Sequence, residues 1–247
     1  MTGLLDRPAV GTWIKLNTPA SVEIMAYAGF DFVVVDLEHT TLNLETAQTM
    51  IALATASGLT PLVRVPDQSP STIQRILDGG AAGILVPHVD SAEQAEAVAR
   101  ACRFPPHGTR GSGATGTAGR WGQLPRADYL RHGNENVLCI PQLESEAAVR
   151  ETGRIAAVAG VNAVFLGAAD LAMDIGGGER VPELLARARE QARAAGIPCG
   201  SAGGSAQAAR QAFDAGDAFV VCSNDTSMLA AAATSLVAAA RDTSPAA

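Results

Sequence analysis

The chain has 247 residues, of which 47% are hydrophobic and 4% are aromatic, and its formal net charge is −7. This length and apolar content predict a globular α/β chain that buries a large core. The chain is acidic and has no cluster of basic residues. Binding to nucleic acid is therefore excluded, because phosphates require concentrated positive charge.

Targeting and redox signals point to the cytoplasm. No segment approaches the roughly 18 uninterrupted apolar residues of a transmembrane helix, and no basic region followed by an apolar stretch opens the chain. The four cysteines are widely spaced and form no CxxC pair, which excludes a zinc knuckle or a disulfide scaffold. We therefore expect a cytoplasmic protein without a membrane anchor.

Short apolar runs alternate with amphipathic stretches along the whole chain. Strands are predicted at 11–16, 31–38, 60–66, 82–89, 137–143, 161–167, 197–201 and 218–223. Helices are predicted at 19–28, 44–57, 70–78, 91–102, 145–158, 182–195, 205–215 and 226–241. Eight strand–helix units in about 250 residues are typical of a (β/α)8 barrel, here a single domain over 1–247. A doubly wound open sheet is the alternative, but no GxGxxG follows the first strand.

Two segments stand apart from this regular pattern. The connection 104–136 is long enough to suggest a functional loop or a subunit contact. The last predicted helix, 226–241, is rich in Ala, Leu, Met and Val and carries little charge before Arg241, so a monomer would leave apolar surface exposed to water. We expect both segments to lie near subunit boundaries.

The second predicted strand ends in a group of ionisable side chains. Its apolar run, 32–35, is typical of a strand buried on both faces, and Asp36, Glu38 and His39 follow directly. In parallel α/β folds the C-terminal ends of strands carry the chemistry, because the loops that follow meet around one cavity. We expect Asp36 and Glu38 to orient His39 or a metal-bound water.

Other predicted strand ends add Arg64, Gln142, Glu144 and Asp170. Glu144 and Asp170 on adjacent strands form a carboxylate pair suited to a hard divalent cation. Arg64 offers a planar fork for a carboxylate or a developing enolate oxygen, and His39 can transfer a proton near neutral pH. These groups together suit chemistry at the carbon next to a carbonyl.

Each residue also has a purely structural interpretation. Glu144 and Asp170 could stabilise helix N-termini, and Arg64 could form a surface ion pair. Trp13 is a candidate core residue. The remaining histidines have no partner evident from the local sequence and are expected to be structural; they are His88, His107 and His132. Because Glu144, Asp170, Arg64 and His39 all fall at the C-terminal ends of predicted strands, a functional role is favoured for these residues.

Several motifs resemble the HpcH/HpaI class II aldolases, in the same order along nearly the whole chain. They are VVVDLEH at 33–39, PLVRVP at 61–66, GGAAGILVPHV at 79–89, FPPHGTRG at 104–111, PQLE at 141–144 and GAADLA at 167–172. The resemblance implies a (β/α)8 barrel and a divalent metal cation such as Mg²⁺, Mn²⁺ or Co²⁺. It implies reversible cleavage of a 2-keto-4-hydroxy acid to an aldehyde and pyruvate, or a related 2-keto acid such as hydroxypyruvate. It also implies a homotrimer or homohexamer in which the C-terminal helix packs on a neighbouring subunit.

The resemblance also implies residue roles by position. Glu144 and Asp170 match the metal ligands, Arg64 the transition-state arginine and His39 the catalytic base. Positions that touch the keto acid or wall its pocket correspond to Gln142, Asp170, the backbone of Ala169, and Trp13. Asp78 matches an aspartate that raises the basicity of the histidine, although the predicted topology puts it at the end of a helix. Ala168 and Ala172 replace a usual proline and serine, which bears on substrate range.

Three alternatives remain open from the residues. Citrate- or malyl-type synthesis from oxaloacetate or an acyl-CoA would use basic residues near the barrel mouth, and the densest group is Arg110, Arg120 and Arg126. A Schiff-base aldolase would need a lysine amine, and Lys15 is the only lysine in the sequence. A keto-acid-binding barrel without turnover is the non-enzymatic alternative.

Overall fold

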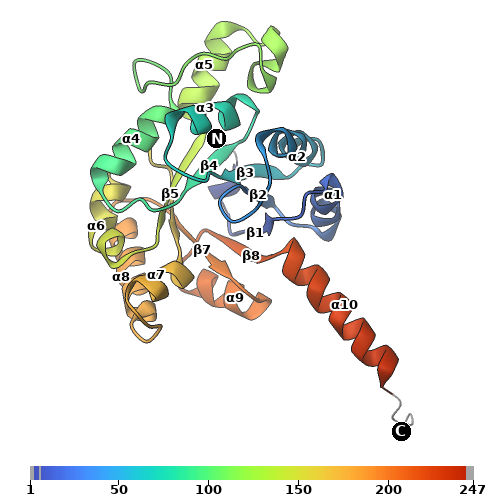
Figure 1. The fold of residues 1–247 in the computed structure, drawn as a ribbon. Helices are drawn as coiled ribbons and strands as arrows, with labels where there is room; N and C mark the ends of the chain where they lie inside the picture. Colours follow the sequence, from blue (N-terminus) through green and yellow to red (C-terminus); the bar gives the residue numbers. More distant parts are fainter. Residues whose placement is uncertain (1–2, 6, 243–247) are drawn as a thin grey trace.

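Eight parallel strands close into a barrel in sequence order, with β1 also pairing with β8 (Figure 1). The structure, a computed structural model, describes residues 3–5 and 7–242. The strands are β1 (Ala9–Ile14), β2 (Phe32–Asp36), β3 (Thr60–Arg64), β4 (Gly83–Val86), β5 (Leu138–Leu143), β6 (Val164–Leu166), β7 (Cys199–Gly203) and β8 (Phe219–Asn224). The predicted (β/α)8 barrel is confirmed.

Helices surround the barrel and return the chain to the start of each next strand. They are η1 (Gly3–Leu5), α1 (Pro19–Ala28), α2 (Leu44–Ala56), α3 (Pro70–Asp78), α4 (Ala92–Cys102), η2 (Thr117–Gly122), α5 (Arg126–Glu135), α6 (Glu146–Ala156), α7 (Ala168–Asp174), α8 (Val181–Ala194), α9 (Ala206–Asp214) and α10 (Asp225–Arg241). Several begin at a side-chain cap; Ser145, for example, accepts a hydrogen bond from the backbone N–H of Ala148. No helix among the described residues is long and apolar enough to cross a membrane.

The barrel interior is filled by large side chains opposite glycines. A Cβ at Gly11 would lie 2.3 Å from the Phe32 ring, and one at Gly200 would lie 2.3 Å from the Phe219 ring. Both phenylalanines are fully buried, and their ring centroids lie 6.0 Å apart. Because the interior is solid, a ligand has room only above this layer, at an end of the barrel.

The 104–136 connection is not the extended loop expected from its length. It contains η2 and α5, which stand outside the ring of helices beyond α3 (Figure 1). Tyr129 of α5 packs on Phe104 with ring centroids 5.0 Å apart, and Gly133 lets that ring approach the helix. The polar, glycine-rich sequence gave no sign of α5, because this short helix is held in place by the contact between the two aromatic side chains.

The C-terminal helix α10 projects away from the barrel (Figure 1). Asp225 is its one buried residue, and the Asp225 carboxylate accepts hydrogen bonds from the backbone N–H groups of Lys15 and Leu16. Beyond this anchor Leu229 is 60% exposed and Leu236 is 71% exposed. From Leu229 onward, one chain therefore leaves the described part of this apolar helix exposed to water.

Candidate active site

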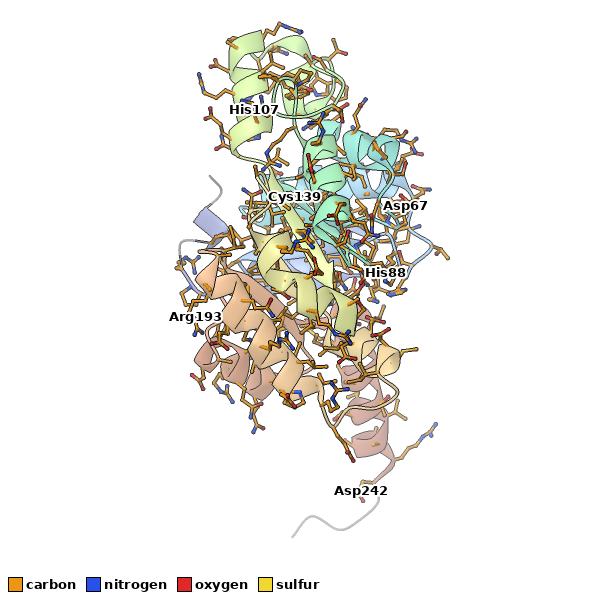
Figure 2. All side chains as sticks on the ribbon, turned by 90° about the vertical axis from the view of Figure 1, so that its left-hand side faces the viewer. Asp67, His88, His107, Cys139, Arg193 and Asp242 are labelled. Atoms are coloured by element: carbon orange, nitrogen blue, oxygen red, sulfur yellow. The ribbon has the colours of Figure 1, made fainter. Side chains whose placement is uncertain are left out.

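The predicted polar residues gather at the C-terminal ends of the strands. Asp36 ends β2, Arg64 ends β3, Glu144 follows β5, and Asp170 lies in the first turn of α7 after β6. In the view across the barrel in Figure 2, Asp67 and His88, which follow β3 and β4, lie on one side and Arg193 of α8 lies on the other. The first side is the barrel mouth.

Asp36 is fully buried and organises the mouth as a hydrogen-bond acceptor. Its carboxylate accepts two hydrogen bonds from Arg64, at 2.9 and 2.7 Å, and lies 2.9 Å from the Nζ atom of Lys15. The backbone N–H groups of Glu38 and His39 also donate to it, each at 3.2 Å. Asp36 therefore holds Arg64 and fixes the start of the loop that carries His39.

The acid stability of the fold should depend on Asp36. Burial raises the pKa of this carboxyl, but Arg64 and then Lys15 outweigh burial and lower the pKa from 3.8 to about 2. A pKa that is lower in the folded state stabilises the fold above about pH 4, and this contribution, about 2 kcal/mol, is lost as the pH falls towards 2. Asp36→Asn should lower the free energy of unfolding at neutral pH and flatten its acid dependence. Urea titrations at several pH values measure both, and a variant with unchanged acid dependence would contradict the assignment.

Arg64 lies between two carboxylates and an aromatic ring. Its Nη1 atom is 3.0 Å from the Oε2 atom of Glu38, and its Cζ atom lies 4.3 Å from the centroid of the Trp13 ring. The side chains of Arg64 and Glu38 are 6% and 9% exposed. This packing fixes the plane of the guanidinium group, so Asp36 and Glu38 orient Arg64 as well as the loop of His39.

Glu144 lies in a crowded acidic environment. Burial, followed by the negative charges of Asp170 and Glu38, raises the pKa of Glu144 from 4.5 to about 7, against hydrogen bonding and charge from His88. One oxygen accepts from the amide of Gln142 and the other accepts from the backbone N–H of His88 at 3.0 Å. Gly167 makes room for this arrangement, because a Cβ there would lie 2.6 Å from the Cγ atom of Glu144.

His88 was expected to be structural, and that expectation is wrong. Its Nδ1 atom lies 3.3 Å from Glu144 and its Nε2 atom lies 3.3 Å from Glu38, so the ring bridges two site carboxylates. The backbone of His88 has a left-handed φ of 55°, which turns the chain directly after β4. The only sequence signal was a histidine near the end of the predicted strand 82–89.

A cavity of about 360 Å³ opens at the mouth. Its lining includes the predicted residues Trp13, Arg64, Gln142, Ala169 and Asp170. Trp13 is 8% exposed and packs edge-on against Phe165, so it acts both as core and as cavity wall. The volume suits a small organic acid.

The chemistry of this cavity fits a hard divalent cation. Glu144 and Asp170 are close enough for their charges to oppose each other, and the Oε1 atom of Gln142 is buried without a hydrogen-bond partner. Carboxylate and amide oxygens are the donors that Mg²⁺ and Mn²⁺ prefer. Within residues 3–5 and 7–242 no group of three or more His, Cys, Asp or Glu side chains is placed to hold a metal. A cation held by two carboxylates would keep coordination positions for water and substrate.

The two remaining predicted catalytic residues differ in position. His39 lies at the mouth with its side chain 54% exposed, 3.6 Å from Glu38. Asp78 ends α3, on the side of the barrel where β4 begins, and its carboxylate accepts from Arg110 at 2.7 Å and from the Tyr129 hydroxyl at 3.4 Å. No contact with His39 of the same chain supports the role expected for Asp78.

Known proteins resemble this chain over almost its whole length. A family model described as HpcH/HpaI aldolase/citrate lyase matches residues 9–244. A 4-hydroxy-2-oxo-heptane-1,7-dioate aldolase of Shigella sonnei is 37% identical over 94% of this chain and 90% of the relative. A 2-dehydro-3,6-dideoxy-6-sulfogluconate aldolase of Pseudomonas putida is 34% identical over 93% of this chain and 91% of the relative.

A solved structure agrees with these matches. A crystal structure of an HpcH/HpaI aldolase/citrate lyase family protein from Burkholderia cenocepacia aligns with a TM-score of 0.91 and 33% identity, over 97% of this chain and 98% of that one. The aldolase relatives show that the activity is that of a carbon–carbon lyase of the class II aldolase type. The chain belongs to the HpcH/HpaI aldolase/citrate lyase family.

Proposed function

We propose that this protein cleaves a 2-keto-4-hydroxy acid reversibly to an aldehyde and pyruvate, or a close 2-keto acid such as hydroxypyruvate, with the help of a divalent cation. The observation that supports this most is the Glu144–Asp170 carboxylate pair, of which Asp170 lines the same strand-end cavity as the Arg64 fork. The relative named for a 4-hydroxy-2-oxo acid supports the same substrate class.

Glu144 and Asp170 would hold the cation, and the free amide oxygen of Gln142 lies in the same environment. When bound, a cation supplies Lewis acidity that polarises a keto group and stabilises enolate charge. The oxygen-only donor set favours Mg²⁺ or Mn²⁺ and also accommodates Co²⁺. Gln142 and the backbone of Ala169 would contact the keto acid, with the Trp13 ring closing one side of the pocket.

Arg64 would bind the keto oxygen on which negative charge develops. Two of the five N–H groups of the guanidinium donate to Asp36, and the Nη1 atom forms an ion pair with Glu38, which leaves other N–H groups for the cavity that Arg64 lines. Because both carboxylates and the Trp13 ring hold the fork in place, little reorganisation is needed as the charge forms. Arg64 therefore serves as a fixed electrostatic partner of the enolate oxygen.

His39 would take the proton of the C4 hydroxyl, directly or through one water. The C3–C4 bond then breaks, its electron pair forms the enolate of pyruvate, and the aldehyde leaves. A proton added to C3 completes pyruvate. The exposed imidazole suits this role because it can reach both the substrate and bulk solvent.

Pyruvate release from a panel of 4-hydroxy-2-oxo acids tests the proposal, with and without exhaustive chelation. We expect turnover that falls on chelation and returns with added Mn²⁺ or Mg²⁺. Acceptance of several aldehydes in the reverse direction, with pyruvate, hydroxypyruvate and oxaloacetate as donors, would define the substrate class. Full turnover after verified metal removal would reject the role of the cation.

His39→Ala should slow cleavage more than it slows enolate formation. Losing a general base costs about 100-fold or more in rate, whereas exchange of the pyruvate methyl protons still has Arg64 and the cation site. Deuterium exchange of pyruvate followed by NMR, compared with cleavage in the same variant, separates the two steps. His107→Ala is the matched control, because His107 lies at the far end of the molecule beside α5 (Figure 2). Equal losses of rate in both reactions would show that His39 is not the base of the cleavage step.

The alternative functions have less support. Arg110 and Arg120 line a second cavity near the start of β4 and β5, so they are not at the mouth where an acyl-CoA would need them. The Lys15 amine lies 2.9 Å from Asp36, and an amine held as an ammonium in an ion pair is a poor Schiff-base nucleophile. A barrel without turnover would not need Arg64, His39, Glu144 and Asp170 together.

A cytoplasmic location is also part of the proposal. All four cysteines are free, and three of them are buried. Disulfides are rare in reducing compartments, so free thiols are consistent with the cytoplasm.

We also propose that the protein assembles as a homotrimer or homohexamer, as expected from the resemblance. The apolar, projecting α10 supports this, because a helix with exposed Leu229 and Leu236 is stabilised by packing on a neighbouring subunit. The contact would lie near the mouth, since α10 starts where β8 ends.

Leu229→Glu combined with Leu236→Glu should therefore give smaller species with lower turnover. These positions spare Asp225, whose hydrogen bonds anchor the helix to its own barrel. Sedimentation velocity measures the mass against the 25.2 kDa of one chain. Thr234→Glu combined with Ser235→Glu, which adds the same two charges at polar positions of α10, is the control. A parent protein that sediments as a fully active monomer would refute the assembly.

A further inference from the structure

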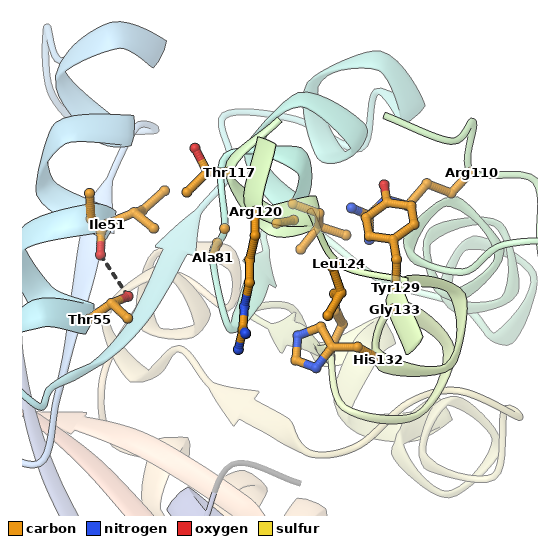
Figure 3. A pocket seen from close by; sticks show the side chains of 15 residues that line it. Ile51, Thr55, Ala81, Arg110, Thr117, Arg120, Leu124, Tyr129, His132 and Gly133 are labelled. Atoms are coloured by element: carbon orange, nitrogen blue, oxygen red, sulfur yellow. Dashed lines mark hydrogen bonds between the residues drawn. The ribbon is translucent and has the colours of Figure 1, made fainter. Parts of the chain in front are cut away.

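A second cavity of about 350 Å³ lies between α2, the end of α3, η2 and α5 (Figure 3). Ala81 and Val137, which precede β4 and β5, line it, so it lies toward the ends of the strands opposite the barrel mouth. None of the functional groups described above belongs to it. Its size lies within the range of small-molecule sites.

The lining combines an apolar wall with positive charge and contains no carboxylate. The apolar side chains come from four elements or their ends, and they are Ile51, Ala52, Leu77, Ala81, Leu124 and Val137. Arg110, Arg120 and His132 supply the polar side. The hydroxyls present already have partners. Thr55 donates to the Ile51 carbonyl (Figure 3), Tyr129 donates to Asp78, and Thr117 accepts from the Gln48 amide.

The arginines retain donors for a ligand. Arg110 is 4% exposed, and although its Nη2 atom donates to Asp78, its Nε atom is buried without a hydrogen-bond partner. The Arg120 guanidinium makes no hydrogen bond or ion pair within the described part of the chain. Burying an unpaired guanidinium N–H is unfavourable, so such a group beside a cavity favours an acceptor that completes it.

The backbone presents Arg120 in an unusual conformation. Arg120 and Trp121 both have left-handed φ angles, 51° and 57°. Residues other than glycine rarely adopt this backbone conformation. Hydrogen bonds from the N–H groups of Trp121 and Gly122 to Gly116 and Ala114 hold the turn. Strain of this kind persists where the surroundings enforce it, and it is frequent at ligand sites.

Positive potential in the cavity also affects His132. Burial lowers the pKa of His132, and the charges of Arg110 and Arg120 lower it further. Figure 3 shows the Arg120 and His132 side chains ending near each other at one side of the cavity. An anion placed there would relieve this repulsion.

We propose that this cavity binds a small organic carboxylate with an apolar body, its carboxylate held by Arg110 and Arg120 and its body against the leucines and Ile51. The site is separate from the proposed aldol chemistry, and neither depends on the other. Calorimetric titration of the full-length protein with 3-phenylpropionate, and with 3-phenylpropanol as the uncharged analogue, tests it. We expect the acid to bind about tenfold or more tightly than the alcohol.

Variants separate charge recognition from occupancy. Arg120→Gln should weaken binding of the acid about tenfold and leave the alcohol unchanged. Ala52→Trp, which fills the cavity from the outer face of α2, should abolish binding of both compounds, and aldolase turnover in each variant reports an intact fold. Arg126→Gln removes an exposed charge outside the cavity and should change neither affinity. Equal affinity of acid and alcohol, equal losses in the Arg120 and Arg126 variants, or no binding at all would overturn the proposal.

Discussion

Glu144→Gln and Asp170→Asn should each abolish Mn²⁺ binding and lower aldol cleavage by about 100-fold or more. Both changes keep the shape of the side chain and remove the charge that would hold the cation. The fold should survive, because the folded chain already disfavours the charged form of Glu144, whose pKa is raised to about 7. Without added cation, Glu144→Gln should become more stable than the parent as the pH rises above about 5, because Glu144 of the parent ionises in the unfolded chain before it ionises in the folded one.

Glu146→Gln is the matched control for these variants. Glu146 lies two residues further along, at the start of α6, and forms surface ion pairs with Arg150 and Arg180. Exposed pairs of this kind contribute little, so binding and turnover should stay at the parent level. Calorimetric titration with Mn²⁺ decides the ligand assignment, which fails if both site variants bind as the parent does.

Arg64→Lys should lower kcat by about 100-fold although the charge is conserved. An ammonium lacks the planar fork that pairs with Asp36 and Glu38 and stacks over Trp13, so it cannot present the same two N–H groups to an enolate oxygen. The buried pair also loses hydrogen bonds between charged groups, which should lower the free energy of unfolding by about 2–4 kcal/mol.

Arg189→Lys separates stability from catalysis in this experiment. Arg189 forms the same two-pronged pair with Asp217, at 2.7 and 3.0 Å, on α8 and away from the cavity at the mouth. Both lysine variants should lose similar stability, measured by urea unfolding, whereas only Arg64→Lys should lose turnover. Near-normal kcat in the Arg64 variant would show that Arg64 contributes only its positive charge to turnover.

The barrel could be predicted because most of its strands are buried on both faces. Runs such as 32–35 must then be continuously apolar, and this pattern is visible in one sequence. Sequence periodicity failed where packing is non-local. The α5 helix depends on Tyr129 meeting Phe104 across a glycine-rich segment, and α7 lies between the predicted strand 161–167 and the predicted helix 182–195, where no helix was expected.

Some residues of the candidate site could likewise be predicted from the sequence, and others could not. Residues at strand ends, such as Asp36, Arg64 and Glu144, could be placed together from topology alone, because parallel strands end on one side. His88 could not, since its role depends on a left-handed turn that directs its ring between Glu38 and Glu144. The expected role of Asp78 came from positional similarity alone, and the helix that carries it runs away from the mouth.

The Lys15–Asp36 ion pair gives this protein an unusual chemical handle. Because Lys15 is the only lysine in the sequence and its side chain is 25% exposed, amine-directed reagents have a single internal target, located beside the candidate active site. Acylation of Lys15 removes one of the two positive charges that pair with the Asp36 carboxylate, and leaves that of Arg64. A fluorophore attached through this amine would therefore report on the barrel mouth with no background from other lysines, once labelling of the N-terminal α-amine is subtracted.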